Sequence, residues 1–151
     1  MKEFETTDDI LDFAMEREQE AHDFYMQLAE KMDIPAMKSV FTGFAREELG
    51  HKKKLEMAKE GKLELGEARK VDDLKIADYV VETEPHEEMD YQDALVLAMK
   101  KEKAAFKLYM DLSDMASDPG MVELFINMAQ EEAKHKLRFE MEYDEHVLEW
   151  N

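Results

Sequence analysis

The chain has 151 residues, enough for one domain with a buried core, and we expect a single domain over residues 1–151. Its formal charge is −18, from 38 acidic and 20 basic residues, which argues against nucleic acid or an anionic membrane as a partner. The chain has no cysteine, which excludes disulfides, thiolate metal sites, iron–sulfur clusters and cysteine nucleophiles. No signal-peptide core and no uncharged apolar run long enough to span a bilayer is found, so we expect a cytoplasmic protein.

Helical spacing of apolar residues predicts four long helices. The abundance of good helix formers, with only 5 glycines and 3 prolines, favours the same reading. The first helix is expected over about 7–33 and the second over 35–61. The third follows a capping residue at Asp90, and the fourth runs from Met121 towards Trp150. The expected fold class is therefore all-α.

The stretch of about 61–90 breaks the helical pattern. It contains two glycines and a proline, and it is too long for a tight turn between antiparallel neighbours. We expect it to be a crossover connection that carries one short helix. A connection of this length lets the third long helix run parallel to the second, so the chain would form two helical hairpins packed as a four-helix bundle.

An internal repeat relates the two predicted hairpins. Residues 14–57 align without gaps to residues 98–141, with 17 identities in 44 positions. Hydrophobic spacing repeats in any helical bundle, so repeated apolar residues alone carry little information. Polar residues repeat as well, because Glu18 matches Glu102 and Tyr25 matches Tyr109. The repeat thus predicts chemistry shared by both halves.

Each half contains a Glu-x-x-His motif on its second helix. Residues three positions apart lie about 60° apart around a helix, so the carboxylate and the imidazole share one face. Glu18 and Glu102 lie within apolar stripes, where a bare carboxylate is costly unless it is protonated, hydrogen-bonded or bound to a cation. Together these residues predict a metal site with six ligands, namely Glu18, Glu48, His51, Glu102, Glu132 and His135.

Four carboxylates and two imidazoles suit two octahedral-leaning divalent ions such as iron or manganese. Glu48 and Glu132 are the carboxylates expected to bridge the two ions. Zinc is less suited, because structural zinc prefers four tetrahedral ligands rich in thiolate or imidazole. One such motif in an acidic chain is weak evidence, but two copies in register, each with an inward glutamate and tyrosine, are strong.

The chain resembles the ferritin-like di-iron carboxylate proteins, and within them the rubrerythrin-related group. The resemblance rests on the two Glu-x-x-His motifs and on the pairs of Glu18 with Tyr25 and Glu102 with Tyr109, and it covers nearly the whole chain. It implies a ferritin-like bundle that binds two iron ions, reacts with dioxygen or hydrogen peroxide and forms a homodimer. Tyr25 and Tyr109 would be hydrogen-bonding or redox-active neighbours of the ligands.

Two departures from the rubrerythrin pattern modify this expectation. Rubrerythrins usually append a cysteine-rich rubredoxin domain that supplies electrons, and the absence of cysteine here implies an external electron donor. Rubrerythrins also carry an extra glutamate near the Glu102 position, whereas Ala104 and Ala105 occupy that turn in this chain. This difference favours a plainer six-ligand site over efficient peroxide reduction of the rubrerythrin type.

Three functions remain open from the sequence. The first is an oxidoreductase of the ferroxidase or peroxidase type, and the alternative is a non-catalytic protein that binds or handles iron or manganese. The third is an interaction scaffold that keeps only the bundle.

Several other positions carry weaker expectations. His22 lies one turn beyond Glu18 and could face the centre, but its repeat partner is Phe106, so it is expected in the core or beside the centre and not as a ligand. Glu47 and Glu131 lie about 100° around their helices from the ligand glutamates, which predicts surface positions or contacts with the ligands. His86 and His146 are expected to be exposed. The residues of the apolar stripes are expected in the core, and Met57, Leu137 and Met141 are among them.

Overall fold

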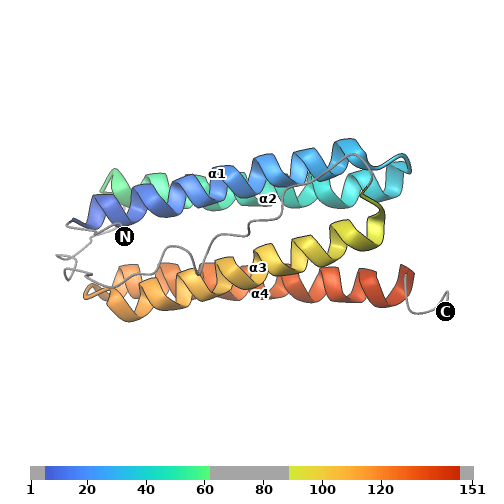
Figure 1. The fold of residues 1–151 in the computed structure, drawn as a ribbon. Helices are drawn as coiled ribbons and strands as arrows, with labels where there is room; N and C mark the ends of the chain where they lie inside the picture. Colours follow the sequence, from blue (N-terminus) through green and yellow to red (C-terminus); the bar gives the residue numbers. More distant parts are fainter. Residues whose placement is uncertain (1–5, 62–88, 147–151) are drawn as a thin grey trace.

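The computed structural model describes residues 6–61 and 89–146. These residues form four α-helices and no strand: α1 (Thr7–Lys31), α2 (Pro35–Lys59), α3 (Tyr91–Met115) and α4 (Pro119–His146) (Figure 1). The all-α prediction is confirmed. The predicted short crossover helix, His86 and the extension of the last helix to Trp150 lie outside the described residues.

The four helices form two antiparallel hairpins. α1 packs along α2 and α3 packs along α4, while the backbones of α1 and α3, and of α2 and α4, come close to each other at only a few positions. Figure 1 shows the first hairpin lying over the second, with α2 and α3 running in the same direction as predicted. Because the hairpins approach each other less closely than the helices within each, large side chains fill the space between them. No helix among residues 6–61 and 89–146 is long and apolar enough to cross a membrane.

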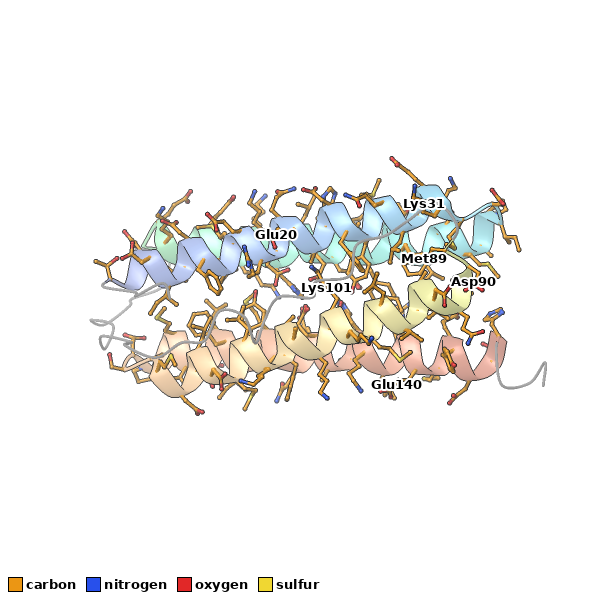
Figure 2. The ribbon with its side chains drawn as sticks, viewed as in Figure 1. Glu20, Lys31, Met89, Asp90, Lys101 and Glu140 are labelled. Atoms are coloured by element: carbon orange, nitrogen blue, oxygen red, sulfur yellow. The ribbon has the colours of Figure 1, made fainter. Side chains whose placement is uncertain are left out.

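Local capping chemistry sets where the helices begin. Thr6 forms a capping box with Asp9, in which the Thr6 hydroxyl accepts from the Asp9 N–H at 3.0 Å. The Asp90 carboxylate accepts from the Asp93 N–H at 2.8 Å and caps α3, at the end of the bundle where Figure 2 labels it. The cap at Asp90 agrees with the prediction. The chain after α2 turns at Gly61, whose φ of 82° lies in the left-handed region that glycine adopts without strain.

The fourth helix begins two residues earlier than predicted. The Asp118 carboxylate accepts from the N–H groups of Gly120 at 2.7 Å and Met121 at 3.2 Å. This capping leaves Pro119 as the first helical residue, a position where the missing N–H of proline costs nothing. Pro119 and Gly120 are poor helix formers in a helix interior, but both are accommodated in the first turn of α4.

The core consists of two apolar clusters. One contains Leu11, Leu55 and Phe125, and the other contains Phe41 and Phe139. On every helix the predicted metal ligands lie in sequence between residues of the first cluster and residues of the second. The fold therefore holds one polar layer across the middle of the bundle, closed at both ends by apolar side chains.

Three residues expected in the core are exposed instead. Met57, Leu137 and Met141 are 46%, 55% and 61% exposed. Each lies two positions from an inward residue and hence about 200° around its helix from it, which directs the side chain outward. The buried faces of α2 and α4 are therefore narrower than the apolar spacing predicted.

Candidate metal centre

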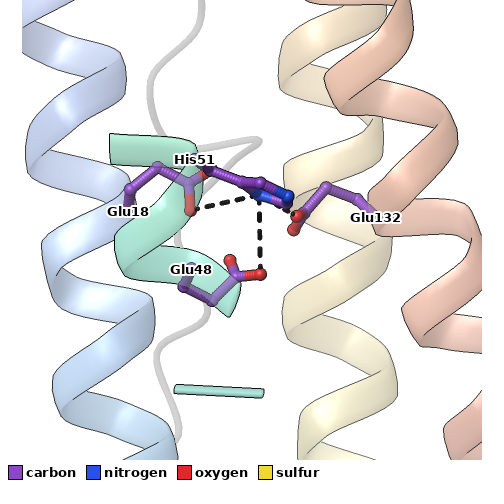
Figure 3. Close-up of side chains that lie close together, drawn as sticks. All are labelled: Glu18, Glu48, His51 and Glu132. Atoms are coloured by element: carbon purple, nitrogen blue, oxygen red, sulfur yellow. Dashed lines mark ion pairs between the residues drawn. The ribbon is translucent and has the colours of Figure 1, made fainter. Parts of the chain in front are cut away.

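The structure brings all six predicted ligands into the polar layer. Each has an exposed fraction of 6% or less, and the four carboxylates are at most 2% exposed. Glu18 comes from α1, Glu48 and His51 from α2, and Glu132 from α4, as the close-up in Figure 3 shows. Charged groups this deeply buried are rare in proteins unless they are paired or bind a metal.

The six residues form two overlapping groups, in each of which the ligand atoms lie within 4.8 Å of one another. One group contains Glu18 and His51, and the other contains Glu102 and His135. Glu48 and Glu132 belong to both groups. Carboxylates shared between two neighbouring ligand sets are the ones positioned to bridge two ions.

In the first group, the imidazole of His51 directs Nδ1 at the carboxylates. Nδ1 lies 2.8 Å from Glu132 Oε1 and 3.7 Å from an oxygen of each of Glu18 and Glu48 (Figure 3). The shortest of these contacts lacks the alignment of a hydrogen bond. The nitrogen therefore shares a small space with three carboxylates without a directed bond to any of them.

The second group repeats this arrangement on the other side of the layer. His135 Nδ1 lies 3.2 Å from Glu48 Oε1 and 3.5 Å from Glu102 Oε1. The two imidazole planes are nearly parallel, at 8°, with ring centroids 5.8 Å apart. The internal repeat in the sequence thus becomes an approximate twofold relation between the two ligand groups.

The outer nitrogens of both imidazoles contact carboxylates from the opposite hairpin. His51 Nε2 contacts Glu131 on α4, and His135 Nε2 lies 2.8 Å from Glu47 Oε2 on α2. A carboxylate accepting from Nε2–H keeps the proton on that nitrogen and leaves the Nδ1 lone pair pointing inward. The sequence predicted that Glu47 and Glu131 would either lie on the surface or contact the ligands. Both contact the candidate ligand histidines.

Two buried tyrosines cross between the hairpins in the same way. The Tyr25 hydroxyl on α1 donates to Glu102 on α3, and the Tyr109 hydroxyl on α3 donates to Glu18 on α1. Burial and the nearby carboxylates raise the pKa of both tyrosines well above the ordinary value. Both therefore remain protonated donors that hold the two outer glutamates in place.

The layer is crowded with acidic groups. Burial, together with neighbouring carboxylates, raises the pKa of Glu48 and Glu132 well above the usual value. Burial alone would lower the pKa of His51, but the carboxylates, Glu18 foremost, raise it to about 9. The pKa of His135 is raised for the same reason, with Glu102 the main carboxylate. A multivalent cation bound among these groups would balance this concentration of negative charge.

The donor atoms fit two hard or borderline divalent ions. Buried atoms without a hydrogen-bond partner include one oxygen each of Glu18, Glu48 and Glu102, both oxygens of Glu132, and Nδ1 of both histidines. Such atoms normally find partners in proteins, so a cluster of them facing one space indicates a ligand. Each ligand group offers several carboxylate oxygens and one imidazole nitrogen, a set that suits iron or manganese better than zinc.

Other predicted positions lie away from the centre. The ring of His22 contacts Asp23, the next residue on α1, at 2.9 Å and belongs to neither ligand group. Its side chain is 24% exposed, so the expectation that it lies in the core was wrong. Ala104 and Ala105 are half-buried on α3, so this turn contributes no further carboxylate. His146 is exposed, as predicted, and contacts Glu142 at 3.3 Å.

Two helical hairpins around a buried layer of four carboxylates and two imidazoles define a ferritin-like carboxylate bundle. The sequence model of the rubrerythrin family matches residues 9–143, and the chain belongs to this family. Among solved structures, it is similar to the hypothetical protein Pfu-1136390-001 from Pyrococcus furiosus, with 27% identity and a TM-score of 0.69. That match covers 94% of this chain and 90% of the other. A comparison with curated proteins finds no match.

Removing an outer carboxylate should weaken metal binding without removing a ligand. We expect Glu131→Ala to lower the affinity for ferrous or manganous ions by about tenfold or more, because the His51 ring loses the partner that orients it. Anaerobic titration with either ion measures the effect. Glu123→Ala, an exposed change on the same helix, serves as the control. Equal affinities in the two variants would show that the Glu131 contact does not orient the imidazole.

Proposed function

We propose that the protein is a cytoplasmic oxidoreductase with a di-iron carboxylate centre that reacts with hydrogen peroxide or dioxygen. The observation that carries the proposal is the sharing of Glu48 and Glu132 between two buried ligand groups. Neighbouring ions with shared ligands suit two-electron chemistry better than two isolated sites would. When bound, two ferrous ions would supply the two electrons that reduce one hydrogen peroxide, with two protons, to two molecules of water.

The protein's own residues would hold and shield the ions. Glu18 with His51, and Glu102 with His135, would each serve one ion, and Glu48 and Glu132 would serve both. Tyr25 and Tyr109 hold the two outer glutamates by hydrogen bonds. The apolar clusters at both ends of the layer keep bulk water from the ligands. A dry, fixed set of ligands strengthens electrostatic interactions inside it.

The electrons for repeated turnover would come from outside these residues. The 151 residues contain no cysteine that could hold an iron–sulfur electron donor. We propose a separate electron-carrier partner for the reduction step, and a homodimer as the assembled form.

A second candidate, iron handling with little turnover, is favoured by one observation. The turn of α3 at Ala104 and Ala105 lacks the additional carboxylate that accompanies peroxide chemistry in related proteins. A centre with six ligands would bind iron without that extra group. The two candidates differ in rate, so one experiment separates them.

The test begins with anaerobic loading of two equivalents of ferrous iron. Addition of hydrogen peroxide, or of air in a parallel sample, is followed by the near-ultraviolet absorbance of ferric iron in a stopped-flow instrument. We expect oxidation much faster than that of free ferrous iron in the same buffer. Bound iron that oxidises no faster than free iron would favour the iron-handling candidate. Failure to bind iron or manganese would contradict both candidates.

A further inference from the structure

A cleft between α2 and α4 opens directly onto the two imidazoles of the centre. It has a volume of about 410 Å³, and its lining includes His51 and His135, the carboxylates of Glu47 and Glu131, and Gly50. The cleft thus lies on the side of the imidazoles where Nε2 contacts the carboxylates of the opposite hairpin. Its volume is many times that of a molecule with two or three heavy atoms.

Among the described residues, this cleft touches the least buried of the six ligands. His51 and His135 are 3% and 6% exposed, whereas the carboxylates are 0–2% exposed. Along the bundle axis the layer is closed by aromatic rings, with Phe44 and Phe139 on one side and Phe125 on the other. A small molecule that approaches from the α2–α4 side meets the imidazoles before any of these rings.

Gly50 lines the cleft from α2. The internal repeat places Lys134 at the matching position on α4, so at this position α4 carries a long side chain and α2 carries none. Glycine in a helix interior is unfavourable relative to alanine, and α2 carries it both at Gly50, which lines the cleft, and at Gly43, which does not. Close packing is not the reason, because a Cβ added at Gly50 would meet no atom within 4 Å.

The cleft is slightly positive, whereas the whole chain is strongly acidic. Lys54, Lys134 and Arg138 line it together with the carboxylates of Glu47 and Glu131, and Lys54 Nζ lies 3.3 Å from Glu131 Oε1. Three cations against two carboxylates leave a small positive formal charge in the lining, on a chain whose formal charge is −18. A positively charged mouth raises the local concentration of small anions and lowers that of cations.

We propose that this cleft is the path by which small neutral or anionic reactants reach the centre, and that Gly50 keeps its mouth open. The inference rests on the proposed function, since it assigns a route to a centre that binds metal. It identifies the class of molecule admitted as one with a few heavy atoms and no positive charge. Hydrogen peroxide and dioxygen satisfy this description.

The test compares Gly50→Leu with Gly43→Leu in iron-loaded, oxidised protein. Gly43 lies two turns earlier on α2, does not line the cleft, and like Gly50 has no atom within 4 Å of an added Cβ. The probe is azide, a three-atom anion whose binding to ferric iron is followed by stopped-flow absorbance. We expect Gly50→Leu to slow azide association at least several-fold, and Gly43→Leu to leave it unchanged. Both variants should bind iron with the wild-type stoichiometry and affinity.

The possible outcomes distinguish a wrong assignment of the route from a wrong assignment of the metal centre. Normal iron binding with equal azide association rates in all three proteins would overturn the cleft as the route, as would a wild-type iron centre that binds no azide. Failure of the wild-type protein to bind iron would overturn both the route and the proposed function.

A second pair of variants tests the charge of the mouth. Lys134→Gln should slow azide association at low ionic strength, and the difference from wild type should shrink as salt is added, because salt screens the attraction. Lys38→Gln, an exposed change on α2 away from the cleft, is the control. The association of nitric oxide, an uncharged probe, with the ferrous centre should be equal in both. An azide rate unaffected by Lys134→Gln would contradict the charge selection.

Discussion

Replacing Glu48 or Glu132 by alanine is expected to abolish the binding of a pair of metal ions. Each of these carboxylates belongs to both ligand groups, so its loss removes a donor from both positions at once. Glu18→Ala removes a donor from one group only and should leave the His135 position able to bind one ion. Anaerobic iron titration, with metal analysis of the desalted protein, measures the stoichiometry of each variant.

The helical fold should survive these substitutions. Removing one of several clustered acidic groups relieves repulsion and desolvation in the metal-free state, which offsets the loss of packing. Circular dichroism of the metal-free variants would check that helix content is unchanged. Glu123→Ala, on the exposed side of α4, is the matched control for the stoichiometry. Unchanged binding of two ions by Glu48→Ala or Glu132→Ala would refute their assignment as bridging ligands.

The stability of the metal-free protein is expected to fall as the pH rises from about 6.5 to about 9. The pKa of His51 is raised from 6.5 to about 9 in the folded protein, so between these values the folded state binds more protons than the unfolded state. The free energy of unfolding must then decrease with increasing pH, by about 1 kcal/mol for each unit from one such group. The raised pKa values of His135, Glu48 and Glu132 act in the same direction.

Metal binding should reverse this dependence. The ligands must lose their protons to bind an ion, so metal affinity rises with pH and the loaded protein gains relative stability over the same window. Urea unfolding at pH 6.5, 7.5 and 8.5, with a chelator or with excess manganous ion, measures both trends. In the chelator series, His51→Gln should flatten the slope. A metal-free protein whose stability stays constant or rises across this window would contradict the protonated state of the buried layer.

The helices and the ligand set could be predicted from the sequence because both depend on local periodicity. The spacing of Glu48 and His51 places both on one helix face whatever the helix packs against. The repeat at an offset of 84 residues then indicates that the second hairpin supplies an equivalent set. No knowledge of tertiary structure is needed for either step.

The contacts that cross between hairpins could not be predicted in detail. Whether Tyr25 meets Glu102, and whether Glu47 meets His135, depends on how far one hairpin is shifted along the other. Helical periodicity contains no information about that shift. The angle around α4 placed Glu131 away from the ligand carboxylates, but the imidazole is long enough to reach it from α2.

The wrong expectations have more than one physical cause. The start of α4 was misplaced because Asp118 caps the helix ahead of Pro119. The ring of His22 contacts Asp23 and its side chain is 24% exposed. Leu137 lies two residues beyond the inward-facing His135 and is exposed, although its side chain is apolar.

The central claim is that one buried layer holds two neighbouring metal ions, and anomalous diffraction tests it most directly. Crystals of iron-reconstituted protein measured at the iron absorption edge should show two strong peaks between Glu48 and Glu132, one beside Nδ1 of each ligand histidine. The exposed cluster of Glu142, Glu145 and His146 is the other group of donors that the described residues bring together, and it serves as an internal reference. A single peak in the buried layer, or iron bound only at the exposed cluster, would contradict the account.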